Sequence, residues 1–322
     1  MSTIIYYLHL IPALFLQIFM LKTKTYYEDD RRQNKRIKGS AIIISNHRSF
    51  LDGLVIALRF FFKRLHFIAT DFYKYRLKIV KFIVYVAGGI FVDSEVNSFD
   101  FIEKSRRIIA KGRSIMIFPE GGFKHTFEPS KFSAGYIMLA VKMGAKIIPI
   151  VNDFNYGLFK RVHLMIGNSI DLSGYTNAEL TKAKFKEINE EIYNKFLLLF
   201  YELKKKKAER LSYKYEFIAP QPGNVIRINA GSYYHYGVFL NANEVIQFGH
   251  AVNRAGENVV VNSVSLNEFC GAKIPEVRII KKRFIRKTED IEKFAKSCLG
   301  QGRYSMMNNN CFDFANRVTL KI

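Results

Sequence analysis

A histidine and an aspartate close together in the sequence form the first pair that could do chemistry. They are His47 and Asp52, in the run Asn46-His47-Arg48-Ser49-Phe50-Leu51-Asp52. Positions five apart on one helix lie about 140° apart around its axis, so the two side chains would diverge within a single helix. They can meet if His47 lies on a loop after a strand and Asp52 in the first turn of the next helix. The carboxylate would then fix the imidazole tautomer and stabilise the imidazolium. We therefore expect His47 to act as a general base, which takes the proton of a hydroxyl as its oxygen attacks an acyl thioester.

Strands and helices alternate around this pair. A β-branched run at Ala41–Ser45 predicts a strand, and the residues from Asp52 onward predict a helix. The pattern also predicts a helix at 98–110, a strand at 114–118, a helix at 134–143 and a strand at 147–151. This alternation indicates an α/β domain with a largely parallel sheet. The run Phe118-Pro119-Glu120-Gly121 ends one of these strands, so it should lie with His47 at the edge where open α/β folds bind ligands.

Together these residues resemble the glycerolipid acyltransferase family, which includes the lysophosphatidate acyltransferases. The four blocks of the family occur in order as Asn46-His47 with Asp52, Gly89-Ile90-Phe91-Val92-Asp93, Phe118-Pro119-Glu120-Gly121 and Ile148-Pro149-Ile150. The resemblance implies that His47 and Asp52 are the catalytic pair and that Glu120 and Gly121 help to hold the acceptor. It also implies that acyl-CoA or acyl carrier protein is the acyl donor, with no cofactor.

Two positions depart from this family. Ser94 stands where the family usually has Arg after the second block, and Gly122-Phe123 stands where the third block usually continues Thr-Arg. Those arginines help to bind the acceptor phosphate, because a guanidinium matches a phosphate bidentately. Lys124, Arg48 or Lys131 could substitute, and we assign Lys124 to acceptor binding. A different acceptor, such as a lysophospholipid headgroup or another lipid alcohol, is the alternative.

A histidine and a cysteine form a second candidate pair late in the chain. His235 lies on the first strand of a predicted hairpin, with strands at 233–240 and 244–248. Cys311 follows Asn310, which is a good N-cap, so Cys311 should open a helix. The helix dipole and free amides favour a thiolate there, so we expect a cysteine of low pKa that acts as a nucleophile. A small buried cysteine beside a structural histidine is the competing interpretation.

The surroundings of this pair resemble the lecithin:retinol acyltransferase-like proteins, which carry a permuted papain-like fold. The resemblance covers about residues 215 to 320 and is carried by Pro222-Gly223-Asn224-Val225-Ile226-Arg227-Ile228, His235-Tyr236-Gly237-Val238 and Asn310-Cys311. It implies that Cys311 takes an acyl group from a phospholipid as a thioester, with His235 as its base. The implied chemistry is that of a phospholipase or transacylase.

The third polar residue of this second site depends on the hairpin loop. The second histidine of the family falls on Gln247. If the loop is the three residues 241–243, Gln247 shares the face of His235, and if it is two residues, His250 does instead. We favour Gln247. Family members usually carry Glu-His after the cysteine, whereas this chain has Phe312-Asp313, which leaves the activity of the second site open.

Charge and aromatic content point to a lipid partner. The 322 residues carry a formal net charge of +22, from 50 Lys and Arg against 28 Asp and Glu, which calls for an anionic partner. Residues 59–64 and 72–76 interleave aromatic and basic side chains, as membrane-surface segments do. We therefore expect membrane phospholipids as partners and no nucleic acid.

The N-terminal segment is a candidate membrane anchor. No Asp, Glu, Lys or Arg interrupts the largely apolar stretch from Ile4 to Leu21. As a helix it would be about 27 Å long, barely enough to cross the hydrocarbon core. We predict an anchor or interfacial helix within residues 1–38, with a buried core helix as the alternative. A basic cluster follows it and would keep the catalytic domains on the cytoplasmic side: Lys22, Lys24, Arg31, Arg32, Lys35, Arg36 and Lys38.

Two domains should follow the anchor. The strongest break in the pattern is Pro220-Gln221-Pro222-Gly223, so we place the boundary near residue 212. The predicted α/β acyltransferase domain is 39–211, and the predicted α+β domain is 212–322. Three cysteines without metal-ligand spacing predict neither a disulfide framework nor a metal site.

The leading interpretation is a membrane-associated lipid-remodelling enzyme with two sites. One site would acylate a hydroxyl from an activated donor, and the other would move or release acyl chains through a cysteine. The alternatives are a papain-like cysteine peptidase or amidase in the second domain, or a lipid-binding scaffold with one inactive domain.

Overall fold

The structure is a computed structural model that divides into two compact units, Met1–Leu199 and Phe200–Ile322. It describes residues 8, 22–29, 37–70, 90–92, 98–124, 126, 128–157, 160–175, 181–250, 259–305 and 309–321. The division falls inside one long helix, α7 (Lys182–Ala208), whereas the predicted boundary lies just after that helix. Apart from Leu8, the predicted anchor helix lies outside the described residues. Within the described ranges, no helix is both long enough and apolar enough to cross a bilayer.

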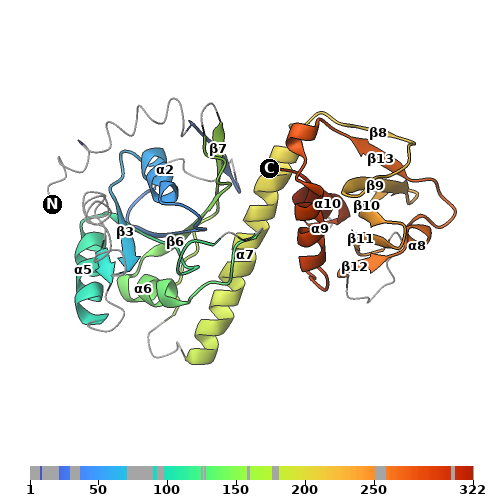
Figure 1. The fold of residues 1–322 in the computed structure, drawn as a ribbon. Helices are drawn as coiled ribbons and strands as arrows, with labels where there is room; N and C mark the ends of the chain where they lie inside the picture. The colour runs from blue at the N-terminus through green and yellow to red at the C-terminus, as the bar shows by residue number, and fades with distance from the viewer. Residues whose placement is uncertain are drawn as a thin grey trace. The chain divides into compact units, whose positions relative to one another are not determined.

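Unit 1 is built on a sheet that is mostly parallel, in the order β1-β7-β6-β2-β5-β3-β4 over the described residues (Figure 1). Its strands are β1 (Lys22–Tyr27), β2 (Ala41–Ser45), β3 (Leu65–Thr70), β4 (Ile90–Val92), β5 (Ser114–Ile117), β6 (Lys146–Asn152) and β7 (Arg161–Ile166). Only β6 and β7 pair antiparallel. Central β2 is buried on both faces, which explains why it reads as an unbroken run with Ile42, Ile43 and Ile44.

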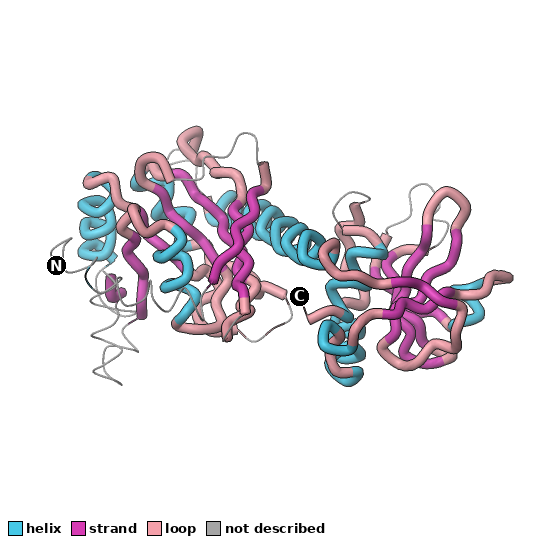
Figure 2. Tube along the Cα trace, turned by 90° about the horizontal axis from the view of Figure 1, so that it is seen from above, coloured by secondary structure: helices cyan, strands magenta, loops and turns pink. Residues whose placement is uncertain are grey.

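Helices cover this sheet. They are α2 (Leu51–Arg59), α5 (Ser98–Ala110), α6 (Gly135–Met143) and the first part of α7, and Figure 2 shows helices flanking the strands of unit 1. Helix α6 ends at Gly144, whose φ of 58° is a left-handed conformation that glycine adopts without strain. The α/β class and the sheet with helices packed on it agree with the prediction.

Two strands of unit 1 were not predicted. The segment Lys22–Tyr27 was assigned to the anchor region, but it forms β1, which pairs in parallel with β7. Its threonines and tyrosines favour a strand, and the sequence pattern gave no sign of a partner because β7 begins more than a hundred residues later. Strand β3 lies between β5 and β4.

Unit 2 contains an antiparallel sheet in the order β12-β11-β10-β9-β13-β8. Its strands are β8 (Lys214–Glu216), β9 (Asn224–Asn229), β10 (Tyr234–Asn241), β11 (Glu244–Phe248), β12 (Val261–Val264) and β13 (Glu276–Ile279). Its helices are α8 (Leu266–Cys270), α9 (Thr288–Ser297) and α10 (Cys311–Thr319), with a short 3-10 turn at Lys282–Phe284. The α+β class agrees with the prediction, although strands β8 and β12 were not predicted. The permuted papain-like arrangement stays a prediction.

Each face of the unit 2 sheet packs against a different helix. Helix α8 packs on β10 and β11, where Phe269 joins a core that includes Ile226, Phe239 and Val245. Helix α10 packs on the opposite face, where Arg278 donates hydrogen bonds to α10 side chains. Residues of β10 therefore face α8 or α10 alternately along the strand.

Candidate active sites

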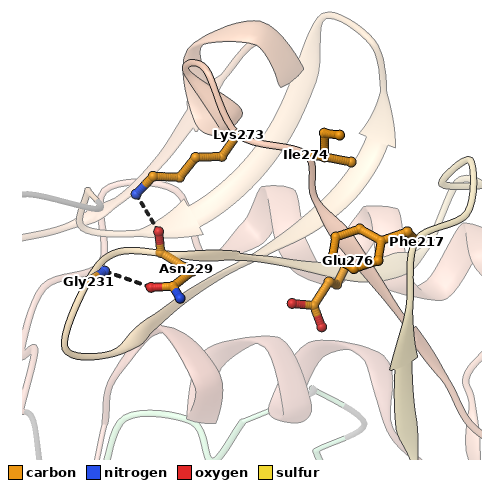
Figure 3. Close-up of a pocket in the computed structure, with 6 residues that line it drawn as sticks. All are labelled: Phe217, Asn229, Gly231, Lys273, Ile274 and Glu276. Carbon is orange, nitrogen blue, oxygen red and sulfur yellow. Dashed lines mark hydrogen bonds between the residues drawn. The ribbon is translucent and has the colours of Figure 1, made fainter.

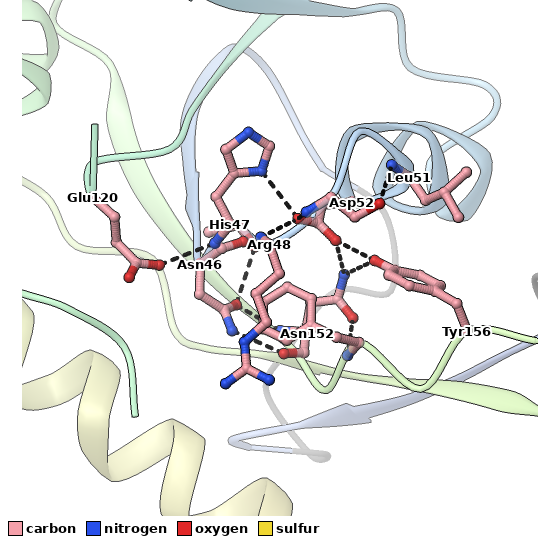
Figure 4. A network of polar contacts seen from close by, with 11 residues as sticks. Asn46, His47, Arg48, Leu51, Asp52, Glu120, Asn152 and Tyr156 are labelled. Carbon is pink, nitrogen blue, oxygen red and sulfur yellow. Dashed lines mark hydrogen bonds and ion pairs between the residues drawn. The ribbon is translucent and has the colours of Figure 1, made fainter. Parts of the chain in front are cut away.

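His47 and Asp52 form a hydrogen-bonded pair in unit 1, with 3.0 Å between His47 Nδ1 and Asp52 Oδ2 (Figure 4). His47 lies on the loop after β2, and Asp52 lies in the first turn of α2. The side chain of Asp52 is fully buried, whereas that of His47 is 16% exposed. The junction between strand and helix thus brings the two side chains together, in the way that the sequence spacing requires.

Asp52 accepts hydrogen bonds on both of its carboxylate oxygens. Oδ2 accepts the backbone N–H groups of Arg48 at 2.7 Å and Ser49 at 2.8 Å, in addition to the His47 contact. Oδ1 accepts from the hydroxyl of Tyr156 and from Asn152 Nδ2 at 3.4 Å. A buried carboxylate surrounded in this way has one orientation, so it holds the imidazole in one tautomer.

Asn152 and Tyr156 are functional candidates that the sequence reasoning missed. Asn152 ends β6, and its amide also donates to Tyr156 Oη at 2.6 Å. Asn46 is bound to the same strand end: its Nδ2 donates to the Asn152 carbonyl at 2.8 Å, and its Oδ1 accepts the Asn152 N–H at 2.9 Å. Burial and the neighbouring Asp52 carboxylate raise the pKa of the Tyr156 hydroxyl, which therefore stays a donor. The fourth sequence block lies directly before these residues, which is the signal that could have found them.

Two aromatic rings cover the imidazole of His47. Phe118 stacks on it with 3.7 Å between ring centroids and an interplanar angle of 9°. Phe123 lies 4.4 Å away at 54°. Because Nδ1 is bound to Asp52, Nε2 is the nitrogen that remains for a reacting hydroxyl.

The residues predicted to hold the acceptor occupy the loop after β5. Both oxygens of Glu120 accept backbone N–H groups, from His47 at 3.0 Å and from Ser130 at 2.7 Å, and burial raises the pKa of this carboxyl. Glu120 therefore links the loop that carries His47 to the segment that carries Ser130. Gly121 has a φ of 73°, which requires glycine, and the Lys124 N–H donates to the His47 carbonyl at 2.8 Å. Direct contact of these residues with an acceptor stays a prediction.

In unit 2, His235 is bound to Gln247, with 2.7 Å between His235 Nε2 and Gln247 Oε1. The loop of the hairpin is the two residues 242–243, because Asn241 pairs with Glu244. A register shift between Phe239 and Asn241 changes the alternation, so Gln247 lies opposite Gly237 and shares the face of His235. Gln247 therefore lies on the expected face. The prediction that a three-residue loop places it there is wrong, because a two-residue loop combined with a bulge in β10 does so.

Asn262 extends this polar chain. Gln247 Nε2 donates to Asn262 Oδ1 at 3.0 Å, which orients the Gln247 amide so that its oxygen faces His235. The second candidate residue, His250, contacts Gln247 Nε2 through Nδ1 at 3.2 Å and not His235. His235 Nε2 then carries the proton, and Nδ1 is the basic nitrogen. Burial lowers the pKa of His235, so its imidazole is neutral.

Cys311 opens α10 as predicted, but its thiol does not have the predicted low pKa. Asn310 caps the helix, with its Oδ1 accepting from Phe312 N and Asp313 N in a capping box. Backbone N–H groups act on the thiol in the expected direction, but burial of a side chain that is 4% exposed outweighs them and raises the pKa of Cys311. The position of a cysteine at a helix N-terminus is therefore not sufficient to predict a low thiol pKa.

Cys311 and His235, which both lie in the described part of the chain, are not joined by a hydrogen bond in the structure, whereas the backbone of Tyr236, next to His235, acts on the Cys311 thiol. His235 faces α8, where its ring lies 5.5 Å from that of Phe269. Helix α10 packs on the other face, where Phe312 lies 4.9 Å from Tyr236. Adjacent positions on one strand point to opposite faces, and sequence spacing could not tell which face α10 covers.

A surface pocket of unit 2 lies apart from the predicted site residues (Figure 3). It is lined by Phe217, Asn229, Gly231, Lys273, Ile274 and Glu276. Phe217 and Ile274 expose 69% and 74% of their side-chain surface. The pocket carries no group that the proposed chemistry uses.

Comparison with known proteins supports both resemblances. Residues 24–153 match the family model "Acyltransferase", and residues 218–320 match "Lecithin retinol acyltransferase". A 1-acyl-sn-glycerol-3-phosphate acyltransferase of Borreliella burgdorferi is 31% identical over 159 residues, which are 45% of this chain and 62% of that protein. The chain thus spans less than two thirds of this curated relative.

A solved structure is also similar. It is the crystal structure of the 1-acyl-sn-glycerophosphate acyltransferase of Thermotoga maritima, with 19% identity and a TM-score of 0.41, covering 60% of this chain and 77% of that one.

Proposed function

We propose that this chain, which joins an Acyltransferase domain to a lecithin retinol acyltransferase domain, is a membrane-associated lipid acyltransferase. The His47 site would transfer a fatty acyl group from acyl-CoA or acyl carrier protein to a hydroxyl of a lysolipid or glycerolipid. The observation that carries the proposal is the 3.0 Å contact between His47 and buried Asp52 inside the matched region.

The geometry of unit 1 suits direct transfer without a covalent enzyme intermediate. Asp52 accepts a hydrogen bond from the Nδ1–H group of His47, so the lone pair on Nε2 is the one that takes the acceptor's proton. The acceptor oxygen forms a bond to the thioester carbonyl carbon, and the carbon–sulfur bond breaks. The leaving thiolate then takes the proton from His47 Nε2, so the products are an ester and a free thiol. Asp52 stabilises the imidazolium that forms between these steps.

A cysteine-dependent activity is the second candidate, for unit 2. Attack of Cys311 Sγ on a phospholipid ester would form a thioester and release a lysolipid, which takes the thiol proton through a base. Water or another hydroxyl would then release the acyl group. The position of Cys311 at a capped helix N-terminus and the family match favour this activity. The lack of a hydrogen bond between His235 and Cys311, both described residues, and the raised pKa of the Cys311 thiol favour the other candidate, a lipid-binding module.

Membrane association and a cytoplasmic location of the catalytic domains are part of the proposal. They are supported by the net charge of +22 and the apolar stretch from Ile4 to Leu21. Substrates with long acyl chains also concentrate in membranes. Membrane phospholipids would therefore be both partners and substrates.

One experiment tests both sites. Purified protein is incubated with radiolabelled acyl-CoA and a panel of lysolipids and lipid alcohols, comparing the wild type with His47→Ala and Cys311→Ala. We expect His47→Ala to lower acyl transfer by about 10²- to 10⁴-fold, the usual contribution of a general base. Cys311→Ala should leave acyl-CoA-dependent transfer unchanged. Full activity of both variants would refute the enzymatic proposal.

A labelled phospholipid separates the two candidates for unit 2. If wild-type protein retains a hydroxylamine-sensitive acyl label that Cys311→Ala lacks, unit 2 forms a thioester. If the wild type takes up no label while it binds the same vesicles, unit 2 is a binding module.

A further inference from the structure

We infer that the His47 site takes an acceptor without a phosphate on the carbon beside the reacting hydroxyl, and that Phe50 and Phe123 form an apolar subsite for it. The acceptor class is thus a neutral lipid alcohol of the acylglycerol type. This inference rests on the acyltransferase function proposed for His47.

The first observation is the ring arrangement at Nε2. Phe118 and Phe123 cover the His47 imidazole, and Phe123 in turn makes an edge contact with Phe50 at 4.8 Å and 80°. Phe50 is 57% exposed, so this aromatic surface reaches solvent. A hydroxyl that approaches His47 from solvent therefore passes along phenyl rings, and the atoms beside that hydroxyl lie against them.

The second observation concerns the cations of the site. The guanidinium of Arg48 donates to the Thr126 carbonyl and lies 4.8 Å from the ring centroid of Phe154. Its charge is also balanced by the carboxylates of Glu120 and Asp52. One side of the Arg48 guanidinium is thus engaged with the protein, and two carboxylates next to it reduce its attraction for a phosphate dianion.

The third observation is the position that Phe123 occupies. It comes two residues after Gly121, where the sequence comparison with the glycerolipid acyltransferases expects an arginine, and its ring lies on the catalytic histidine. A phosphate placed there would lose water without gaining a bidentate partner, which is costly for a charged group. The faces of aromatic rings carry partial negative charge and would add to that cost. An acyl or glyceryl carbon placed against Phe123 has no comparable desolvation cost.

Lys124 and Lys131 are the exposed lysines that could oppose this inference, and the nearer of them to Phe123 in sequence is Lys124. It follows Phe123 and its side chain is exposed, so an ammonium is available at the rim of the site. A single flexible ammonium at the rim matches a phosphate less well than a guanidinium. The experiment therefore includes Lys124→Ala.

The test compares two acceptors that share one oleoyl chain, monooleoylglycerol and oleoyl lysophosphatidate, with oleoyl-CoA as donor and the full chain as enzyme. We expect the wild type to have a kcat/KM for monooleoylglycerol that is about tenfold or more above that for lysophosphatidate. A charged phosphate that lacks one hydrogen-bond partner at the site loses about this much. Phe123→Arg should shift the ratio toward lysophosphatidate by about tenfold or more for the same reason. Leu198→Arg adds the same charge at a 37% exposed apolar position of unit 1 outside the site and should leave the ratio unchanged.

The outcomes separate this inference from the proposed function. If the wild type acylates neither acceptor nor any other lipid hydroxyl, the proposed function of His47 fails. If it acylates lysophosphatidate more efficiently than monooleoylglycerol, the function stands and the inference is overturned. Loss of that preference in Lys124→Ala would then assign phosphate binding to Lys124. The wild-type ratio decides the matter even if Phe123→Arg does not fold.

Discussion

The two candidate sites both contain a histidine held by a polar partner, but the partners differ in charge. In unit 1 the partner is the buried carboxylate of Asp52, which also binds backbone amides, an asparagine and a tyrosine. In unit 2 it is the amide of Gln247, which Asn262 orients in turn. A carboxylate stabilises the charged form of an imidazole by its own charge. The neutral Gln247 amide raises the pKa of His235 by less than burial lowers it.

Exposure separates the two sites further. His47 is 16% exposed, Asp52 binds its Nδ1 and not its Nε2, and two phenylalanine rings lie against its imidazole. His235 is 1% exposed, and the nucleophile assigned to it begins a helix on the other face of the sheet. In unit 1 the histidine is hydrogen-bonded to its predicted catalytic partner, whereas within the described residues no hydrogen bond joins His235 to Cys311. The residue types along the sequence did not show this difference between the surroundings of His47 and those of His235.

The largest effect should come from removing the charge behind His47. Asp52→Asn keeps the shape of the side chain but loses the carboxylate that stabilises the imidazolium, and it presents an N–H to groups that are themselves donors. We expect kcat for acyl transfer to fall by about 10³-fold, within the range of a general-base effect. Steady-state kinetics with acyl-CoA measures it.

Asp171→Asn serves as the control, because Asp171 is an exposed carboxylate of the same unit. It should behave as the wild type. If Asp52→Asn loses less than threefold, the difference drawn between carboxylate and amide partners is wrong.

An intermediate effect should appear in the pH dependence of unit 2. Burial lowers the pKa of His235 below its ordinary value of 6.5. Just below pH 6.5 the imidazole is therefore protonated in the unfolded chain but neutral in the folded chain. The folded state should therefore lose stability as pH falls below 6.5, by at most about 2 kcal/mol at pH 5. Hydrogen exchange of the β10 amides at pH 7 and pH 5, corrected for intrinsic rates, measures this loss.

His235→Gln should remove that part of the pH dependence, because glutamine does not titrate. The corresponding amides of β2 in unit 1 provide the internal reference. An unchanged slope in His235→Gln would show that His235 is accessible to protons in the folded state, and the contrast in burial between the two sites would not hold.

The smallest effect should come from Tyr156→Phe. This change removes one donor to Asp52 Oδ1 while Asn152 and the donors to Oδ2 remain. We expect kcat to fall about fivefold with KM unchanged, in keeping with the loss of about 1 kcal/mol from one hydrogen bond. A positioning role predicts this split between kcat and KM.

Tyr136→Phe removes a comparable buried hydroxyl, which donates to Asn189 at 2.9 Å away from the site. It should lower the melting temperature without changing kcat. Equal losses of kcat in the two tyrosine variants would mean that Tyr156 acts only through stability.

Much of the site in unit 1 could be predicted because its parts are close together in sequence. A β-branched run, a loop with a histidine and a helix that begins near an aspartate require a contact across a single junction, and that contact occurs between His47 and Asp52. The residues that complete the network lie about a hundred positions away, Asn152 at the end of β6 and Tyr156 in the loop that follows it. Spacing carries no information about them, because their proximity depends on the order of strands in the sheet.

The sequence by itself determined the two family resemblances, the alternation of strands and helices in unit 1, and the candidate side chains for transfer of a proton or an acyl group. Local periodicity and short motifs suffice for these, because each depends on residues within one element or one loop. Only the tertiary structure decided which rings cover His47, which partner binds His235, and which face of the sheet α10 occupies. These three features depend on strand order and on the bulge between Phe239 and Asn241. The pKa of Cys311 depends on tertiary burial, which raises it more than the backbone N–H groups at the helix N-terminus lower it.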